Sequence, residues 1–339
     1  MDAEAGYHVA LRAGGTRPVV HPVTTLPVAF VSDAILPVVR SPDLDWHVHS
    51  VFRQALNLEA GGRLIAVAPQ AAGGLPNGMS VSGHPDFRAL GVSMPMAVTG
   101  SWPSFEIADA RLRFDLARAW SWSPRLRAGT IDPHDGTIQR RVEVAAEVVA
   151  ARATRVGFAQ CVTLLRPALV GAAADARSGG SRPAPLSWEP AGPPGSAASI
   201  GLHSIETLRR AVAAHDLPAA IQATDALVGL GEGLTPSGDD LLVGLTAALR
   251  ATGHPMAGSL SRHAAFRAVD STTDVARVAL EHAARGDYPE RLHDVLEAVA
   301  HGDDASLRVQ VERALSWGAS SGADALLGIL IGLEAAAAA

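Results

Sequence analysis

Hydrophobic and polar positions follow a short period in the first half of the chain and a helical period in the second half. Up to residue 170, brief runs of β-branched and apolar residues are bounded by Gly, Pro and Ser, a pattern typical of strands. This pattern predicts strands at 27–31, 63–67 and 92–98. One longer segment, 138–153, has a helical composition and is expected to pack beside the sheet.

Helices dominate the second half of the chain. From residue 205 onward, apolar residues recur at i, i+3 and i+4. The predicted helices span 208–213, 219–230, 237–251, 258–268, 273–285, 289–300, 305–317 and 321–334. Gly253, Gly286 and Gly302 stand where helix ends are expected, because glycine readily adopts the left-handed conformation that ends a helix.

The two patterns are separated by residues 171–199, which are rich in Ala, Gly, Pro and Ser. A segment of this composition buries little apolar surface, so it is interpreted as a linker or a long exposed loop. A chain of 339 residues is long enough for two domains. We therefore expect an α+β protein, with a β-rich N-terminal domain at 1–170 and an all-helical C-terminal domain at 200–339.

One motif occurs twice in the helical half. The run SGDDLLVG at 237–244 matches SGADALLG at 321–328 at its Ser, Gly, second Asp, Leu and Gly positions. In each copy a Ser is followed three residues later by an Asp, which predicts a capping box at the start of an apolar helix. Two interpretations stay open for Ser321, Gly322 and Asp324. They cap a duplicated core helix, or the two helix N-termini converge on one ligand.

The first copy carries more than a helix cap needs. Three glycines precede it at alternate positions, where they expose backbone N–H groups to a ligand. The predicted ligand-binding residues are Gly229, Gly231, Gly233, Thr235, Ser237, Gly238, Ser321, Gly322 and Asp324. A helix N-terminus suits phosphate or carboxylate, so a small anionic substrate is expected. The adjacent Asp239 and Asp240 are the predicted catalytic residues, which either hold a Mg²⁺ bridged to phosphate or orient an amine.

Composition restricts the chemistry further. All 28 cationic side chains are Arg, so no Schiff-base lysine and no Walker-type phosphate lysine is available. A net charge of -6 without a basic stripe argues against a nucleic-acid partner. Cys161 is the only cysteine, which excludes an intrachain disulfide and favours a reducing, cytoplasmic location. Neither a signal peptide nor a long uninterrupted apolar stretch is found, so no membrane span is expected.

Two other groups have alternative interpretations. His47 and His49 fall on one face of a strand and could bind a metal, although a surface pair is the simpler interpretation. Trp102, Trp120 and Trp122 are expected in the core of the β-rich half rather than as stacking platforms.

The glycine-rich motif carries a family resemblance. The runs 229–244, 271–275, 282–286 and 318–328 resemble the AllH-like family, formerly a domain of unknown function. The likeness covers residues 205–334 well and the N-terminal half loosely, at 51–64. Its most specific part is the run Gly-Leu-Thr-Pro-Ser-Gly-Asp-Asp that ends at Asp240.

The resemblance implies a subunit of oxamate carbamoyltransferase, which acts with other protein subunits in anaerobic allantoin degradation. The implied reaction joins carbamoyl phosphate and oxamate to give oxalurate and phosphate, or runs in reverse. Where the family often has His-Thr this chain has Ala319 and Ser320, so an acid–base role at that position does not carry over. The Ser-x-Arg-Thr-Arg loop of ordinary carbamoyltransferases is also missing. Two other classes stay open: a non-catalytic binding or scaffolding subunit, and a stand-alone hydrolase or lyase acting on a small polar acid.

Overall fold

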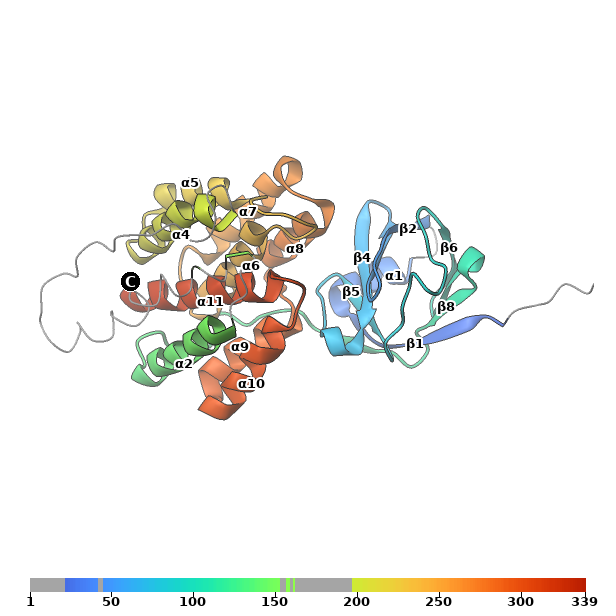
Figure 1. Cartoon of the computed structure of the whole chain (residues 1–339), viewed down its shortest axis with the longest axis horizontal. Helices are drawn as coiled ribbons and strands as arrows, with labels where there is room; N and C mark the ends of the chain where they lie inside the picture. The colour runs from blue at the N-terminus through green and yellow to red at the C-terminus, as the bar shows by residue number, and fades with distance from the viewer. Residues whose placement is uncertain (1–21, 42–44, 153–156, 159–160, 162–196) are drawn as a thin grey trace, which may run out of the picture.

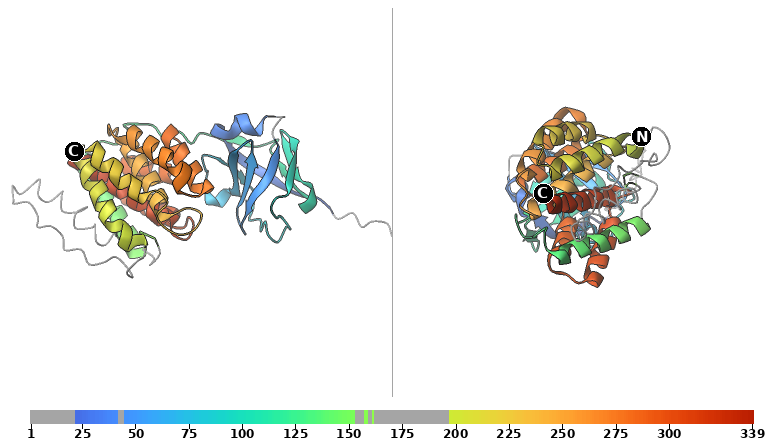
Figure 2. Two further views of the ribbon diagram at one scale, coloured as in Figure 1. Left: turned by 90° about the horizontal axis from the view of Figure 1, so that it is seen from above. Right: turned by 90° about the vertical axis from the view of Figure 1, so that its left-hand side faces the viewer.

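The computed structural model describes residues 22–41, 45–152, 157, 158, 161 and 197–339. A β-rich unit from the N-terminal part of the chain lies beside a helical unit (Figure 1). A view turned by a right angle shows the same arrangement (Figure 2). The expected α+β class is therefore confirmed. Most of the predicted linker, 171–196, lies outside the described residues, and helix α4 begins at Ala197.

The β-rich unit is a closed barrel. Its strands are β1 (Thr24–Ser32), β2 (Trp46–Val51), β3 (Leu56–Ala60), β4 (Arg63–Pro69), β5 (Gly78–Val81), β6 (Ala97–Ser101), β7 (Ser104–Ile107), β8 (Leu112–Asp115) and β9 (Trp120–Trp122). They follow the order β5-β4-β3-β2-β6-β7-β8-β1, and pairing of β5 with β1 closes the ring. Strand β9 pairs in parallel with β1 as an additional strand. Closure matters because it removes the free edges that an open sheet would expose.

Buried side chains from several strands fill the barrel. Leu58, Ile65 and Phe114 are all fully buried in one apolar core. Strand β1 pairs with β8 through its first residues and with β5 and β9 through its last, so one long strand fastens both sides of the ring. Short helical segments complete the unit: η1 (Asp33–Ile35), α1 (Leu36–Val39), η2 (Gln70–Ala72) and η3 (Ala108–Ala110).

Two of the predicted strands are confirmed and one is mostly wrong. The segments 27–31 and 63–67 fall within β1 and β4. In 92–98, only Ala97 and Val98 belong to a strand, because β6 begins at Ala97. The preceding residues form a turn in which the Met96 N–H donates to the Ser93 carbonyl at 3.1 Å. Pro95 accounts for the difference, since proline has no N–H to contribute to a strand ladder.

The helical unit contains α2 (Gly136–Arg152), α4 (Ala197–Ala213), α5 (Leu217–Leu227), α6 (Ser237–Ala251), α7 (Ala257–Ser271), α8 (Asp274–Arg285), α9 (Glu290–His301), α10 (Asp304–Leu315) and α11 (Ser321–Ala338). Every helix predicted from residue 208 onward is confirmed, although α4 begins eleven residues before the predicted start at 208, and the other ends shift slightly. The segment 138–153 is helical, but its expected position beside the sheet is wrong. Helix α2 packs against α9, α10 and α11, and Arg141 donates to the carbonyls of Val299 and Ala300, both at 2.9 Å.

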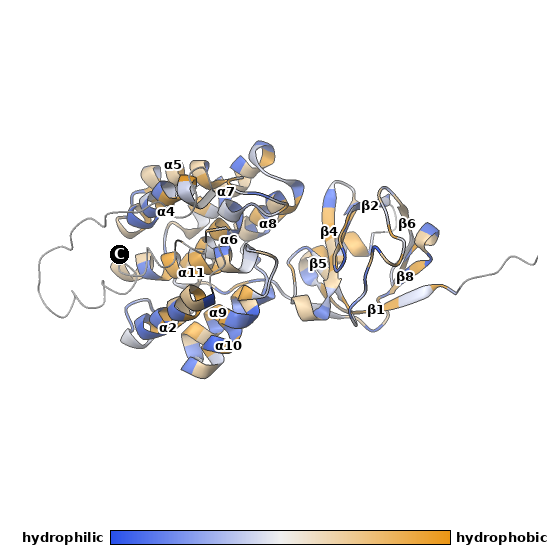
Figure 3. Cartoon of the chain, viewed as in Figure 1, coloured by the Kyte–Doolittle hydropathy of each residue, from blue (hydrophilic) through white to orange (hydrophobic). Residues whose placement is uncertain are grey.

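Helices α6 and α11, which carry the two copies of the motif, form the centre of the helical unit. Apolar residues are concentrated on these helices, whereas α2 and α10 present many polar residues (Figure 3). A Cβ added at Gly244 would lie 1.9 Å from the Ala325 carbonyl oxygen, and one at Gly328 would lie 2.0 Å from that of Leu241. From Gly328 to Gly332 of α11 the nearest carbonyl oxygen of α6 changes from that of Leu241 to that of Leu245, so the contacts advance in the same direction and the helices run parallel in close backbone contact. Their N-termini therefore lie side by side.

Helix α11 is long and apolar enough to cross a membrane by length and composition alone. In this fold 89% of it is buried against the rest of the protein. Its apolar character is therefore accounted for by its place in the core, as in many buried helices.

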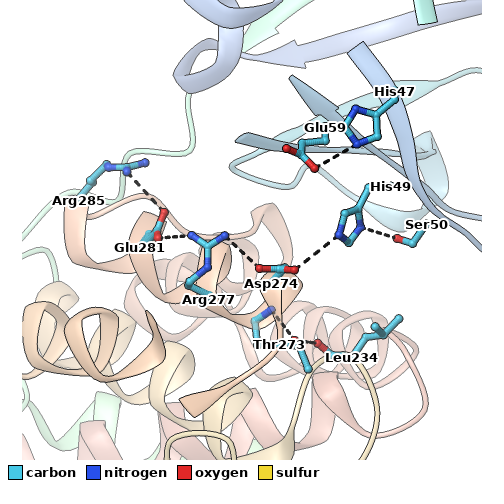
Figure 4. A network of polar contacts seen from close by, with 11 residues as sticks. His47, His49, Ser50, Glu59, Leu234, Thr273, Asp274, Arg277, Glu281 and Arg285 are labelled. Atoms are coloured by element: carbon cyan, nitrogen blue, oxygen red, sulfur yellow. Dashed lines mark hydrogen bonds and ion pairs between the residues drawn. The ribbon is translucent and has the colours of Figure 1, made fainter. Parts of the chain in front are cut away.

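Several polar contacts join the barrel to the helical unit. Arg291 of α9 is buried and donates to the carbonyls of Ala71 and Ala72, and Glu290 accepts from the Gly74 N–H at 2.7 Å. At the opposite edge, Asp274 lies between His49 of β2 and Arg277 of α8, at 3.6 and 3.3 Å (Figure 4). Contacts of Glu281 with Arg277 and Arg285 continue this network along α8. These contacts fix the position of the helix N-termini relative to the barrel.

Candidate functional site

Helices α6 and α11 each begin at the first serine of the motif, whereas a capping box requires that serine to be the N-cap residue just before the helix. Pro236 and Ser320 occupy the N-cap positions, and neither provides a side-chain cap. Ser237 and Ser321 are the first helical residues. The predicted capping boxes are therefore wrong. In the first copy proline takes the cap position and Ser237 becomes the first helical residue, and in the second copy Ser320 takes the cap position. The hydroxyl of Ser321 instead lies 2.9 Å from that of Thr235, which links the two motif copies.

Close packing is the main reason why glycine is needed in the glycine-rich loop. A Cβ at Gly229 would lie 2.0 Å from the Ser271 carbonyl oxygen, and one at Gly238 would lie 1.9 Å from that of Leu227. Gly229, Gly231 and Gly233 also have positive φ, which favours glycine. Two of the N–H groups are engaged within the fold: Gly229 donates to Asp239 at 3.0 Å, and Gly238 donates to the Leu230 carbonyl at 2.8 Å.

Asp239 is buried with both carboxylate oxygens occupied. Oδ1 accepts from the Gly229 N–H at 3.0 Å, and Oδ2 accepts from the Thr272 hydroxyl at 2.5 Å. Burial raises the pKa of Asp239 to about 6, although these two hydrogen bonds oppose the rise. The carboxylate thus fastens the glycine loop to the residue that follows α7.

Asp240 has a different environment. Burial raises the pKa of Asp240 well above its ordinary value, hydrogen bonds with the Ser321 and Thr235 hydroxyls oppose the rise, and the charges of Asp324 and Asp239 add to it. Its Oδ2 is fully buried and has no hydrogen-bond partner among the described residues. Such a shift favours the neutral carboxyl, which can donate a hydrogen bond to a ligand.

Asp324 is the equivalent residue of the second motif copy. Its side chain is fully buried, and its Oδ1 accepts from the Phe158 N–H at 2.5 Å. Asp324 lies close enough to Asp240 for its charge to raise the pKa of that carboxyl. The neighbouring Gly322 packs against the Ala314 carbonyl, where a Cβ would lie 1.9 Å from the oxygen. The structure therefore brings the two motif copies together, as the convergence hypothesis expects.

A cavity of about 340 Å³ lies where these helix N-termini meet the barrel. Of the predicted site residues, Thr235, Asp240 and Ser321 line it. The other predicted site residues are not among its lining residues: Gly229, Gly231, Gly233, Ser237, Gly238, Asp239, Gly322 and Asp324. A cavity between two domains, with apolar walls and a few convergent polar groups, is a common form of small-molecule site.

Sequence reasoning did not predict the remaining wall of this cavity. The barrel contributes Asn57 of β3 and Asn77, which precedes β5, and the helical unit adds His282 of α8 and Trp317. The asparagines carry no motif, so only the docking of the two units could reveal them. His282 belongs to one of the runs that resemble the family, which was the available signal for it.

Another hollow, larger and more open, lies at the start of α2 and α10 with a volume of about 730 Å³. Its walls include Arg140 and Asp304, which pair with each other at 3.1 Å. It contains none of the predicted site residues. We therefore place the candidate site at the cavity between the domains.

The described residues contain no group of three or more His, Cys, Asp or Glu side chains placed to hold a metal ion. Both oxygens of Asp239 already accept hydrogen bonds, which leaves the alternative of Mg²⁺ at Asp239 and Asp240 without a free carboxylate pair. His47 contacts Glu59 at 3.2 Å, and His49 contacts Asp274 (Figure 4). This histidine pair therefore takes part in surface and interdomain contacts.

The expected core position of the tryptophans is wrong for Trp120, whose exposure is 51%. Trp120 lies on the additional strand β9, where its ring packs on Phe30 at 4.8 Å between centroids. Trp102 is partly buried and carries the Arg40 guanidinium over its ring. Neither residue is among those that line the cavity.

The raised pKa of Asp239 predicts a pH-dependent stability. The folded-state value of about 6 exceeds the usual 3.8, so this group stabilises the fold fully below pH 4 and progressively less as pH rises through 6. The asparagine in Asp239→Asn keeps the acceptor for Gly229 and stays neutral. We expect the stability of the variant relative to the parent to grow by about 2 kcal/mol from pH 4.5 to 7.5. Urea unfolding at both pH values measures this change.

Asp303→Asn provides the matched control. Asp303 is an exposed N-cap residue, and a hydrogen bond from the Ser306 backbone lowers its pKa. Its contribution to the stability of the fold is therefore lost only as the pH falls below the pKa of a free carboxyl. We expect no comparable change for this variant between pH 4.5 and 7.5. Parallel stability curves for Asp239→Asn and the parent would contradict the electrostatic account of Asp239.

The fold defines an α+β protein with a cavity between its β-rich unit and its helical unit. Two sequence models of one family match the chain. The AllH family N-terminal domain matches residues 31–121, and the oxamate carbamoyltransferase subunit AllH matches residues 227–333. The chain therefore belongs to the AllH family, and one match falls in the barrel and the other in the helical unit. No solved structure matches the chain.

Proposed function

We propose that this protein is a subunit of an oxamate carbamoyltransferase and that the cavity between its domains holds oxamate or its product oxalurate. The observation that carries the proposal is the unpartnered Oδ2 of Asp240, buried beside a cavity at two parallel helix N-termini. A buried polar atom without a partner is costly, so such an atom beside a cavity is well suited to a ligand. Under this proposal the enzyme acts in allantoin degradation in the cytoplasm.

The chemistry of oxamate fits this position. Its carboxylate suits the partial positive charge of the α6 and α11 N-termini and the hydroxyls of Thr235 and Ser321. Its amide carbonyl is an acceptor for the neutral carboxyl of Asp240. Asn57 and Asn77 on the barrel wall present amide groups to the same small volume. The two domains together would thus hold one small, planar, singly charged molecule.

The proposed transfer balances without a covalent intermediate. The amide nitrogen of oxamate attacks the carbonyl carbon of carbamoyl phosphate, and a new C–N bond forms. The C–O bond to phosphate breaks, and the proton lost by the amide nitrogen ends on the phosphate. Positioning and charge stabilisation are sufficient to accelerate such a step.

Charge also indicates why other subunits are needed. Carbamoyl phosphate carries about two negative charges near neutral pH, as phosphate monoesters do. Among the described residues that line the cavity, none is an arginine, and His282 is the one residue that can carry a positive charge. The chain has no lysine. We infer that the cations that hold the phosphate group come from another subunit, which accords with the family description of AllH as a subunit.

Calorimetric titration of the purified chain tests this proposal. We expect oxamate and oxalurate to bind with a Kd below about 1 mM, within the usual range of substrate affinities, and carbamoyl phosphate at least roughly tenfold more weakly. Carbamoyl transfer is expected only after the other subunits of such an enzyme are added. Failure of oxamate and oxalurate to bind, alone or in the assembly, would favour a scaffolding subunit. Turnover of a small acid by the chain alone would favour a hydrolase or lyase.

A further inference from the structure

A second titratable group lines the cavity besides Asp240. His282 lies in the last turn of α8, with an exposure of 6%. Its Nδ1 is fully buried and lies 3.7 Å from Oδ2 of Asp287. This separation is longer than a hydrogen bond, and contacts of catalytic groups are often loose before a ligand binds. With Nδ1 directed to Asp287, Nε2 is the nitrogen left for the cavity.

The chain turns sharply to bring Asp287 back to the histidine. Gly286 ends α8 in the left-handed conformation, with φ of 86°, and the Asp287 N–H then donates to the His282 carbonyl at 2.9 Å. Without this turn, an aspartate five residues after the histidine would lie more than one helical turn away. The glycine thus places the carboxylate beside the ring.

Asp287 is itself fixed by the segment that links the barrel to α2. Its exposure is 4%, and its Oδ1 forms an ion pair with Nε of Arg125 at 3.0 Å. Arg125 also forms an isolated β-bridge with Asp287. The order Arg125, Asp287, His282 therefore runs from the interdomain connection to the cavity wall. A carboxylate that orients an imidazole through Nδ1 is the arrangement that tunes histidine for proton transfer.

We propose that His282 is the proton-transferring residue of this site, oriented by Asp287. The inference rests on the proposed function, because it needs an amide nitrogen that loses a proton. In the step, Nε2 of neutral His282 takes the proton from the oxamate nitrogen as the C–N bond forms. The imidazolium then gives that proton to the departing phosphate oxygen as the C–O bond breaks, so the histidine returns to its neutral state.

Two titratable groups of opposite roles then share the cavity. Asp240, at the helix N-termini, donates a hydrogen bond in its neutral form. His282, on α8, acts as the base. Pairs of groups whose surroundings separate their protonation states are typical of acid–base sites. A general base must be unprotonated to accept a proton, so activity that depends on one falls on the acid side of the pH profile.

The test is the pH dependence of kcat in the assembled enzyme for the parent, His282→Gln and Asp287→Asn. General base catalysis contributes about 10²- to 10⁴-fold, so we expect His282→Gln to lower kcat at least roughly 100-fold and to abolish the acid limb of the profile. Asp287→Asn should lower kcat to a smaller extent than His282→Gln does, and it should displace the acid limb of the profile to a different pH. KM for oxamate should change less than kcat in both variants, because the histidine acts mainly in the transition state.

His263→Gln is the matched control. His263 of α7 also faces an aspartate, with Nε2 2.8 Å from Oδ1 of Asp225, but it does not line the cavity. This variant should keep the kcat and pH profile of the parent. A second substitution, His282→Asn, covers the case in which His282→Gln fails to fold.

The outcomes separate the two proposals. If the parent binds oxamate and turns over with its partner subunits, but folded His282→Gln or His282→Asn retains kcat within about threefold and the same acid limb, the role of His282 is overturned and the proposed function stands. If the parent neither binds oxamate nor shows transfer in the assembly, the proposed function fails, and the role of His282 fails with it.

Discussion

Replacing Gly328 with alanine is expected to destabilise the protein by about 3 kcal/mol, the upper end of the range seen when a packed core is overfilled. An added Cβ would lie 2.0 Å from the Leu241 carbonyl oxygen and 2.7 Å from the Leu245 N–H nitrogen. Both are backbone atoms of α6, so no side-chain rotation can relieve the contact. The two helices would have to separate, and their N-termini would no longer meet at the cavity.

Urea unfolding followed by far-UV circular dichroism measures this effect. Alanine is intrinsically the better helix former by up to about 1 kcal/mol, so a loss of stability can only come from the contact. Gly136→Ala is the control, because Gly136 starts α2 and has no atom within 4 Å of its added Cβ. We expect that variant to equal or exceed the stability of the parent. A Gly328→Ala protein within about 1 kcal/mol of the parent would contradict the observed packing of α6 on α11.

Asp240→Leu is expected to weaken oxamate binding about 10- to 100-fold while the fold is retained. The lost interaction is a hydrogen bond between the buried carboxyl and a charged ligand, which contributes about 1.5–3 kcal/mol. Leucine has a shape similar to that of aspartate, and the substitution removes a carboxyl group that is desolvated in the fold. The Thr235 and Ser321 hydroxyls, 2.9 Å apart, keep each other as partners. Calorimetric titration and thermal unfolding of the same preparations separate binding from stability.

The conservative variant decides which protonation state Asp240 uses. Asp240→Asn keeps a donor at the position of Oδ2, so binding should stay within about tenfold of the parent if the carboxyl acts in its neutral form. A loss as large as that of Asp240→Leu would show instead that the negative charge is required. Unchanged binding in both variants would place the ligand elsewhere and would favour the scaffolding interpretation of the cavity.

Much of the helical unit could be predicted from residues alone. Helices of 11 residues or more bury one face each, so their apolar positions repeat with a helical period that a single sequence displays. The repeat of Ser-Gly-x-Asp left open whether the two N-termini converge or only cap a duplicated core helix, and α6 and α11 do lie in parallel contact. The capping boxes were wrong because the cap position falls one residue earlier: Pro236 and Ser320 take it, and the Ser321 hydroxyl pairs with that of Thr235.

The barrel and the cavity were harder to predict. Strands of three to nine residues carry little periodic information, and whether a ring closes depends on pairing between β1 and β5, which lie far apart in sequence. The predicted position of α2 was also wrong, because the apolar face of this helix fits a sheet or another helix equally well. Asn57, Asn77 and His282 became site residues only through docking of the two units.

The sequence by itself determined the α+β class, the helices, the family and the motif at 229–240, because each depends on local periodicity or on a contiguous run of residues. Tertiary structure decided which carboxylate serves which purpose. Asp239 and Asp240 are adjacent and chemically identical, yet successive helical residues point about 100° apart. One side chain therefore fastens the glycine loop through Gly229 and Thr272, and the other faces the cavity.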